Sequence, residues 1–319
     1  MICVQNNWKI LILQEERYIV SGGICMLYEM KNKKNIKDII QYGKAGGAFL
    51  LHCLLHDICD INNFFVFDSM EEFEKIKDSL PEFITLRADA KIGEKPTLGV
   101  RGCELHKSED AVREYIEAVK KSNPDGVVLC MNTNTVQKNL PIEGSFNVYF
   151  EYGKKVYIDY LGAGFDVGGI TKGEEMHECY VIDWNELLFV KPNNLNTYRS
   201  YLITQEEYVE SAERRIDFYI KKDGCGRDKA REKVPQKYKP MPLYIKQLLL
   251  DEIIFPIYVK ADEIKRLGLE SFGIQGMIRN GNLFPIEVNR RERFAAKQDT
   301  EKQDLVEEKK QREYLNRRC

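Results

Sequence analysis

The segment Phe284–Arg291 places a carboxylate and a carboxamide two residues apart. It reads Phe-Pro-Ile-Glu-Val-Asn-Arg-Arg, so Glu287 and Asn289 alternate with apolar residues. Residues two apart in a strand point to the same face, and two side-chain oxygens on one face can share a hard cation such as Mg²⁺. Either of the two arginines that end the segment can take a phosphate. The alternative is an edge strand with an ordinary polar face, because Glu-x-Asn alone is a short motif.

Two glycine-rich stretches are the next candidates. Lys91–Gly102 holds three glycines with lysines and arginine, and backbone N–H groups and basic side chains in such a loop suit phosphate oxygens. Tyr160–His177 has four glycines between 162 and 169, followed by Lys172, and can hold an acidic co-substrate or a γ-phosphate. For both stretches the alternative is a solvated surface loop.

Two other stretches contain residues that could bind a metal ion or an anion, but in both a purely structural role is favoured. His52 and His56 share a helix face with Cys59 or Asp60 one turn on, a spacing that suits Zn²⁺, yet no Glu lies between them and a buried helix is favoured. The basic run Arg214–Lys239 is diluted by acids, which favours a solvated helix and loop over an anion clamp or a mobile lid.

The elements that must position these residues change character along the chain. The first half predicts alternating strands and helices: strands at Phe64–Phe67, Phe83–Leu86 and Val127–Met131, and helices at Asn35–Leu55 (interrupted at Gly46-Gly47), Asp68–Leu80 and Ser108–Lys121. The second half predicts the hairpins Phe146–Leu161 and Phe272–Val288, the latter with an Asn-Gly turn. It also predicts a helix at Glu206–Lys221 and a mostly helical stretch at Leu243–Leu267 that is bent or broken at Pro256. The predicted class is α+β.

Composition limits the function further. The 319 residues carry 48 basic and 50 acidic side chains, a net charge of −2 that gives no general attraction to nucleic acid or to an anionic membrane. No apolar run reaches the roughly 18 residues that span a bilayer. The nine scattered cysteines, without a Cys-x-x-Cys pair, predict free thiols in a reducing cytoplasm.

In the order of its motifs, the region 63–294 resembles the ATP-grasp superfamily. A helix, a hairpin whose second strand presents Glu287-x-Asn289, and a following arginine are similar to the metal-binding end of that family. The resemblance implies an ATP-grasp-like α+β fold in which two subdomains enclose a nucleotide cleft. The implied division is a short N-terminal α/β domain (1–62), the first subdomain (63–125), the second subdomain with the metal-binding hairpin (126–294) and a charged C-terminal helix (295–319).

The resemblance also implies roles for individual residues. ATP would contact Arg87, Lys91, Lys95, Gly99, Leu129, Met131 and Glu143, with the strand 127–132 beside adenine and Glu143 near the ribose. Mg²⁺ would be held by Glu287 and Asn289, and Arg291 and Lys172 would act on the transferring group. Two departures stand out: Arg87 replaces a more usual lysine, and Gln275 stands where the family has an acidic metal ligand, so that either one metal is lost, another acid such as Asp159 substitutes, or the protein is a degraded member.

The implied activity is that of an ATP- and Mg²⁺-dependent ligase. It would activate the carboxylate of a small molecule or peptide as an acyl phosphate, which an amine or thiol then displaces. The alternative is a non-catalytic nucleotide-binding or scaffold protein of the same architecture. Nucleic-acid binding through Arg214–Lys239 is disfavoured by the near-neutral charge. No membrane partner is expected, and a homo-oligomer stays open.

Overall fold

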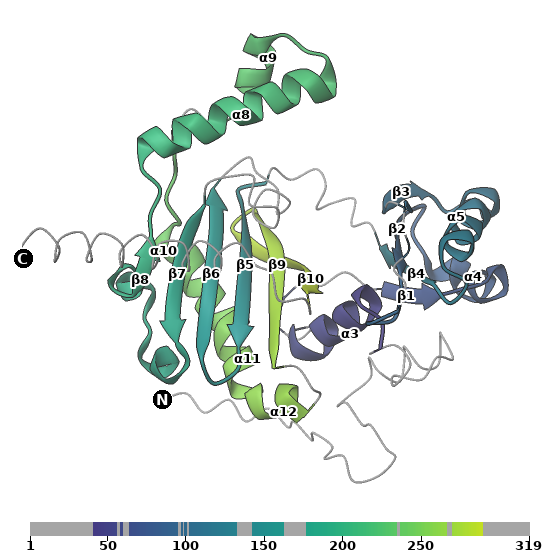
Figure 1. Ribbon diagram of the computed structural model, residues 1–319, viewed down its shortest axis with the longest axis horizontal. Coiled ribbons are helices and arrows are strands. Elements are labelled where there is room, and N and C mark those ends of the chain that lie inside the picture. Colours follow the sequence, from purple (N-terminus) through teal and green to yellow (C-terminus); the bar gives the residue numbers. More distant parts are fainter. Residues whose placement is uncertain are drawn as a thin grey trace, which may run out of the picture. The chain divides into compact units, whose positions relative to one another are not determined.

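A computed structural model describes residues 41–55, 58–59, 64–94, 97, 99–100, 102–132, 142–162, 177–234, 237–266 and 270–289. The chain forms two compact units, one of residues 1–53 and 62–135 and the other of residues 54–61 and 136–319. Each unit contains one antiparallel sheet together with helices, which confirms the predicted α+β class (Figure 1). Within the described ranges, no helix is both long and apolar enough to cross a bilayer.

The first unit is a four-stranded sheet in the order β1-β4-β2-β3. Its elements are α3 (Lys44–Leu55), β1 (Phe64–Phe67), α4 (Met70–Ile76), the 3-10 turn η1 (Lys77–Ser79), β2 (Phe83–Asp89), β3 (Cys103–His106), α5 (Glu109–Ser122) and β4 (Val127–Asn132). On one face, Phe73 of α4 and Ile116 of α5 pack with Leu86 of β2 in a buried apolar cluster. On the other face, Phe49 of α3 packs with Leu129 of β4. Apolar residues therefore alternate between two covered faces.

Two of the three helices that the sequence predicts in this unit begin with a serine cap. The Ser69 hydroxyl accepts a hydrogen bond from Glu72 N at 3.4 Å, and the Ser108 hydroxyl accepts one from Ala111 N at 3.4 Å. These bonds satisfy backbone donors that the first turn of a helix leaves without a partner.

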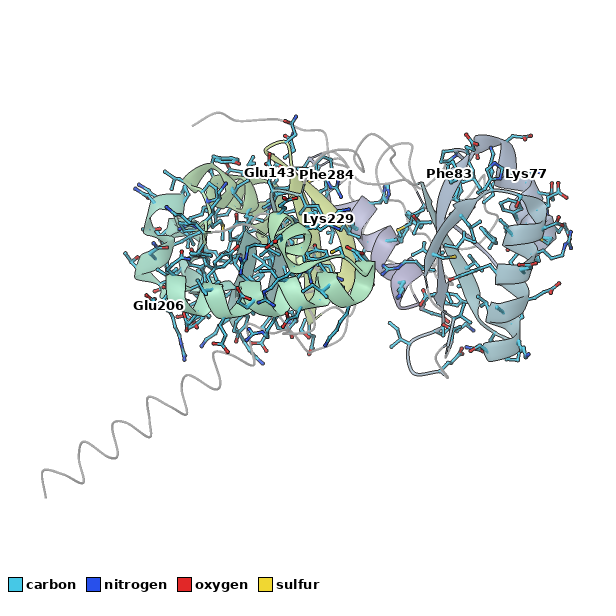
Figure 2. The ribbon with its side chains drawn as sticks, turned by 90° about the horizontal axis from the view of Figure 1, so that it is seen from above. Lys77, Phe83, Glu143, Glu206, Lys229 and Phe284 are labelled. Atoms are coloured by element: carbon cyan, nitrogen blue, oxygen red, sulfur yellow. The ribbon has the colours of Figure 1, made fainter. Side chains whose placement is uncertain are left out.

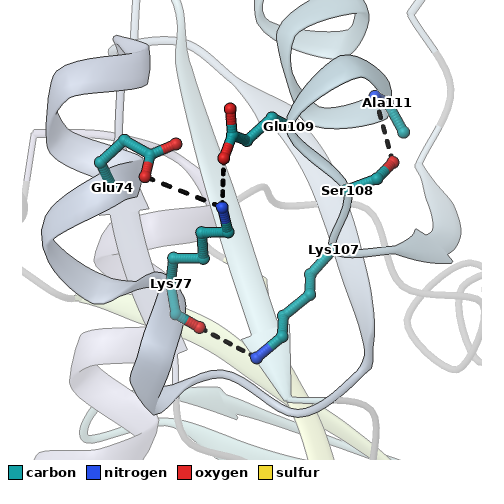
Figure 3. A network of polar contacts seen from close by, with 6 residues as sticks. All are labelled: Glu74, Lys77, Lys107, Ser108, Glu109 and Ala111. Atoms are coloured by element: carbon teal, nitrogen blue, oxygen red, sulfur yellow. Dashed lines mark hydrogen bonds and ion pairs between the residues drawn. The ribbon is translucent and has the colours of Figure 1, made fainter.

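A polar network joins the end of α4 to the start of α5 (Figure 3). Lys77 forms ion pairs with Glu109 of α5 and, at 3.8 Å, with Glu74 of α4. Lys107 Nζ donates to the carbonyl oxygens of Lys77 at 3.1 Å and of Leu80 at 2.6 Å. Lys107 thereby bonds carbonyl groups at both ends of the turn η1, which follows α4.

The second unit is a six-stranded sheet in the order β10-β9-β5-β6-β7-β8. Its elements are β5 (Gly144–Glu151), β6 (Lys155–Gly162), β7 (Glu178–Asp183), η2 (Trp184–Phe189), η3 (Pro192–Thr197), β8 (Arg199–Tyr201), α8 (Gln205–Asp223), α9 (Arg227–Glu232), α10 (Leu243–Leu248), the π-helix η4 (Leu249–Ile254), α11 (Phe255–Val259), α12 (Ala261–Arg266), β9 (Ser271–Arg279) and β10 (Asn282–Asn289). The helices from α10 to α11 lie along one face of this sheet (Figure 1). Ile158, Ile274 and Val288 are almost completely buried on their strands.

Both predicted hairpins are confirmed. Gly153 turns β5 into β6 with a φ of +68°, and Asn280 and Gly281 turn β9 into β10 with φ values of +48° and +71°. Two successive residues with positive φ are the signature of a type I′ turn, which explains why Asn-Gly stands there.

Two helical predictions need correction. The expected interruption at Gly46-Gly47 is wrong, because α3 continues through both glycines and Asp89 Oδ2 anchors its start by accepting from Lys44 N and Ala45 N at 2.8 and 2.7 Å. The helix is not broken at Pro256, since α10, η4 and α11 follow one another without a gap, and it widens just before the proline: Phe255 N–H bonds to Leu250 O, five residues back. A proline ring clashes with the carbonyl four residues earlier in an α-helix, and the wider turn accommodates it.

The predicted boundary between the two subdomains, at residue 126, lies just before β4. That division places residue 126 at the start of the second subdomain, whereas β4 pairs with β1 and β2 in the first sheet. The proposed N-terminal domain lies mostly, and the C-terminal helix entirely, outside the described residues.

Candidate functional site

A row of polar side chains crosses four neighbouring strands of the second unit. Glu287 of β10 lies opposite Gln275 of β9, Gln275 lies opposite Asn147 of β5, and Asn147 lies opposite Asp159 of β6. Directly opposed residues in an antiparallel sheet point to the same face. Lys246 of α10 lies over the ring of Tyr180, which pairs with Ile158, the residue before Asp159. The four polar side chains therefore belong to the face opposite to the one that α10 covers.

A β-bulge decides which face Glu287 occupies. Pro285 pairs with Gly276, but Glu287 pairs with the next residue, Gln275, so that Ile286 is an extra residue in β10. Without it, strict alternation from Pro285 would place Glu287 on the helix-covered face and Val288 on the polar one. With it, Val288 is 1% exposed in the core and Glu287 is half-buried on the polar face.

Asn289 shares the face of Glu287. It follows two residues later on β10 and lies opposite Gly273 of β9, which has no side chain. The predicted metal ligands are thus brought together by the strand, at the spacing that lets two oxygens face one cation.

The position of Asp159 decides whether it can replace the acidic metal ligand that Gln275 does not supply. Asp159 lies three strands away from Glu287 in the same row, which at the usual strand spacing is about 14 Å. Asp159 therefore cannot share an ion with Glu287, and the idea that it substitutes for the missing acid is wrong. Among the described residues no three His, Cys, Asp or Glu side chains converge as metal ligands.

Glu287 and Asn289 still fit a magnesium ion. Mg²⁺ is usually held by one or two carboxylates together with waters and substrate phosphates, rather than by a complete protein cage. One carboxylate, one carboxamide oxygen and the neutral Gln275 opposite them are compatible with that pattern.

In the first unit, three predicted ATP contacts share one face. Arg87 of β2 lies opposite Leu129 of β4, and Met131 follows two residues after Leu129. This is the face that α3 covers in part, with Leu129 buried and Arg87 and Met131 half-buried. A Cβ on Gly102 would stand 3.4 Å from Arg87 Cγ, so the absence of a side chain there leaves room for the arginine.

Three further predicted contacts lie on loops. Lys91 forms a backbone bridge with Tyr42, and its Nζ is 3.8 Å from Glu94 Oε1. Gly99 has a φ of +80° with open space around it, a conformation that favours glycine. Glu143 lies beside the β9–β10 hairpin (Figure 2), where its Oε2 accepts a hydrogen bond from Gly281 N at 2.9 Å. Its ribose contact stays a prediction, since the structure shows one carboxylate oxygen engaged in the turn.

The remaining predicted site residues, Lys95, Lys172 and Arg291, lie outside the described residues.

For His52 and for the basic run Arg214–Lys239, the structure favours a structural role over a binding site. His52 is 6% exposed and packs against Phe64 at 5.1 Å between ring centroids, in agreement with a core histidine, while His56 lies outside the described residues. In the basic run, Arg227 forms ion pairs with Glu213 and Asp217, so α9 is tied to α8 by opposite charges. This pairing favours the solvated-helix interpretation over an anion clamp.

The row of polar side chains across β10, β9, β5 and β6 was not predicted from the sequence. Asp159 and His177 were named but not connected, whereas the structure places His177 Nε2 3.3 Å from Asp159 Oδ1. Asn147, which donates from Nδ2 to Asp159 Oδ2 at 3.1 Å, had not been singled out. An asparagine at the centre of the apolar strand Phe-Asn-Val-Tyr-Phe was the available signal.

Comparison with known proteins gives structural matches only. No protein-family model and no curated protein sequence matches the chain. Among solved structures it is similar to the macrocyclase MdnC bound with precursor peptide MdnA from Microcystis aeruginosa MRC (9% identity, 85% of this chain, 61% of that chain, TM-score 0.33). It is also similar to ACD1 of Ca. Korarchaeum cryptofilum in complex with coenzyme A (14%, 80%, 98%, 0.41) and to D-alanine–D-alanine ligase of Bacillus anthracis complexed with ATP (10%, 82%, 53%, 0.33).

The chain spans less than two thirds of the macrocyclase and about half of the D-alanine–D-alanine ligase. TM-scores this low do not establish a shared activity, so the functional inference depends on the residues of this chain.

Proposed function

We propose that the chain is an ATP- and Mg²⁺-dependent ligase of the ATP-grasp type. In this reaction the γ-phosphoryl group of ATP is transferred to a carboxylate, giving an acyl phosphate and ADP. An amine or a thiol then attacks the acyl carbon and phosphate leaves. The acceptor would be a carboxylate of a small molecule or a peptide.

The observation that carries the proposal is the bulge in β10. The extra residue Ile286 places Glu287 and Asn289 together on the polar face, opposite Gln275 and Gly273. Bulges are enriched next to active sites, where they aim a side chain. A bulge that exposes one carboxylate and one carboxamide, and buries the valine between them, supports a binding role for this strand.

The proposed roles follow from charge and position. Glu287 and Asn289 would hold Mg²⁺, which when bound neutralises charge on the phosphates during transfer. Arg87, half-buried on β2, would bind phosphate oxygens, and the backbone of β4 around Leu129 and Met131 would contact adenine. Lys91, Lys95 and Gly99 would contribute to phosphate binding, and Lys172 and Arg291 to the transferring group.

A second candidate function is favoured by Gln275. A neutral side chain directly opposite Glu287 lowers the negative charge available to a hard cation. A protein that binds nucleotide without transferring phosphate is the alternative that this observation supports.

The test is an assay for the acyl phosphate. The full chain is incubated with Mg·ATP, a panel of carboxylic acids and hydroxylamine, a strong nucleophile that converts acyl phosphates into hydroxamates. We expect ADP and an acyl hydroxamate to form in equal amounts with at least one acid. Saturable ATP binding without ADP under all conditions would instead favour the non-catalytic candidate, and the absence of both would contradict the proposal.

A further inference from the structure

We propose that Asp159, His177 and Asn147 form a buried binding site for a divalent transition-metal cation of the Zn²⁺ type. The site is separate from Glu287 and Asn289, and it does not depend on the proposed ligase activity. It lies wholly within the second unit, on β5, on β6 and at the residue before β7.

The three side chains are almost inaccessible to solvent. Asp159 and Asn147 are 0% exposed, and His177 is 4% exposed. Ionisable side chains this deeply buried are uncommon unless they are paired or bind a metal ion. The cluster therefore needs a specific explanation.

Two oxygen acceptors in the cluster have no hydrogen-bond partner. Asp159 Oδ1 and Asn147 Oδ1 are both buried and neither accepts a hydrogen bond. Asp159 Oδ2, by contrast, accepts from Asn147 Nδ2 at 3.1 Å. A buried oxygen without a donor is costly, and a cation bound by Asp159 would satisfy its Oδ1.

The distance between the two strongest ligands suits tetrahedral coordination. Asp159 Oδ1 lies 3.3 Å from His177 Nε2, longer than the usual charge-assisted hydrogen bond. Two ligands at about 2.0–2.1 Å from a tetrahedral ion are separated by about 3.3–3.4 Å. The observed distance is therefore close to one edge of a zinc-type site.

Asn147 can supply the third ligand. A half-turn of its carboxamide exchanges Oδ1 with Nδ2, which places an oxygen beside the Asp159 carboxylate. That oxygen would be repelled by the carboxylate alone, and it would be stabilised if a cation lay between them. No third His, Cys, Asp or Glu joins the pair among the described residues, so a carboxamide ligand or water must complete the coordination.

The donor set selects the type of metal. An imidazole nitrogen with a carboxylate oxygen suits Zn²⁺ and related ions, whereas Mg²⁺ prefers oxygen ligands only. Glu287 lies three strands away in the same sheet, about 14 Å at the usual strand spacing, so the two sites can be occupied independently.

Metal retention by the full chain tests the proposal. Purified protein is stripped with a chelator, incubated with Zn²⁺, passed over a desalting column and analysed for metal. We expect about one equivalent of retained Zn²⁺, and at least about 10-fold weaker binding for Asp159→Asn and for His177→Ala. Wild-type protein that retains no zinc, or a His177→Ala variant that binds as tightly as wild type, would overturn the proposal.

Two matched variants serve as controls. His106 Nε2 lies 3.6 Å from Glu82 Oε1 in an exposed pair, so His106→Ala removes a similar histidine and should leave zinc binding unchanged. Glu287→Gln should also leave it unchanged, which separates this site from the proposed magnesium site.

Because the variants can fail to fold, a titration of wild-type protein with Co²⁺ gives a second test that does not need them. Co²⁺ added to stripped wild-type protein should give the strong visible absorption of a four-coordinate site, and one equivalent of Zn²⁺ should abolish it. If Co²⁺ shows only the weak spectrum of the hydrated ion, Asp159 and His177 form a buried ion pair and the metal site does not exist.

Discussion

Glu287 on β10 lies directly opposite Gln275 on β9, on the face of the sheet that the helices α10 to α11 do not cover. The carboxylate thus has a neutral amide as its cross-strand neighbour. Charge count tunes the affinity of oxygen ligands for hard cations. We therefore expect Mg²⁺ to bind tightly only together with the phosphates of ATP.

Replacing Glu287 tests the role of the carboxylate in turnover. Glu287→Gln retains size and shape, and Glu287 is only half-buried, so the melting temperature should stay near that of wild type. ADP formation should fall by about 10²-fold or more, the scale seen when one preorganised electrostatic partner is removed. Steady-state kinetics with the acid found in the hydroxamate assay would measure the change.

Two variants control that measurement. Glu206→Gln changes an exposed glutamate on α8 and should leave turnover unchanged. His52→Ala should lower stability, because His52 is packed against Phe64 in the core, but should leave the turnover of the folded protein unaltered. Wild-type turnover by Glu287→Gln, combined with loss of turnover in folded His52→Ala, would move the chemistry to α3.

Introducing a second carboxylate beside Glu287 should strengthen Mg²⁺ binding. Gln275→Glu places a second carboxylate directly opposite Glu287, and we expect the Mg²⁺ concentration for half-maximal ATP binding to fall by about 10-fold. Calorimetric titration of Mg²⁺ at fixed ATP would measure it. An unchanged Mg²⁺ requirement in a folded variant would show that the ion does not bind beside Glu287.

The sequence predicted the features that depend on neighbouring residues. Asn280-Gly281 predicted the β9–β10 hairpin, because a type I′ turn needs two residues that accept positive φ. The helix starts predicted at Asp68-Ser69 and at Ser108 have serine caps, and a cap is a local hydrogen bond. These signals lie within a few positions of the structure that they specify.

The features that the sequence did not predict depend on long-range pairing. Asn147 and Gln275 are far apart in the chain and become neighbours only when β5 pairs with β9. The bulge at Ile286 is likewise a property of the register between β10 and β9, and period-two alternation alone does not reveal it. The polar row therefore became visible only in the folded sheet.

The buried Asp89 should give a pH-dependent contribution to stability. Burial raises the pKa of its carboxyl group, although the backbone N–H groups of Ala45, Lys44 and Ala90 oppose the shift. A raised folded pKa means that the folded state holds the proton more tightly. The stability gained from this proton is complete below the unfolded pKa of about 3.9 and is lost as pH rises through the higher folded value.

Urea unfolding of wild type and Asp89→Asn across this acidic range would measure the effect. The free energy of unfolding of wild type, relative to Asp89→Asn, should decrease as pH rises. An increase with pH would show that the hydrogen bonds from the start of α3 outweigh the cost of burial.

The cysteines should be free and slow to react. Cys59, Cys103, Cys130 and Cys225 form no disulfide, and burial raises the pKa of Cys59 and of Cys130 to about 12. Since the thiolate is the reactive form, both should be alkylated far more slowly in the folded protein at pH 8 than after unfolding. Mass spectrometry under non-reducing conditions should find nine free thiols, and a mass lower by two hydrogens would reveal a disulfide.

Nucleotide binding tests the central claim most directly. Binding of a ligand to the folded state alone raises the melting temperature. We predict that Mg·ATP at millimolar concentration raises that of wild type, and that ATP with a chelator or Mg·ATP with Glu287→Gln gives a much smaller shift. A well-folded wild-type protein with no shift, or a Glu287→Gln variant with the full Mg²⁺-dependent shift, would contradict the account of this site.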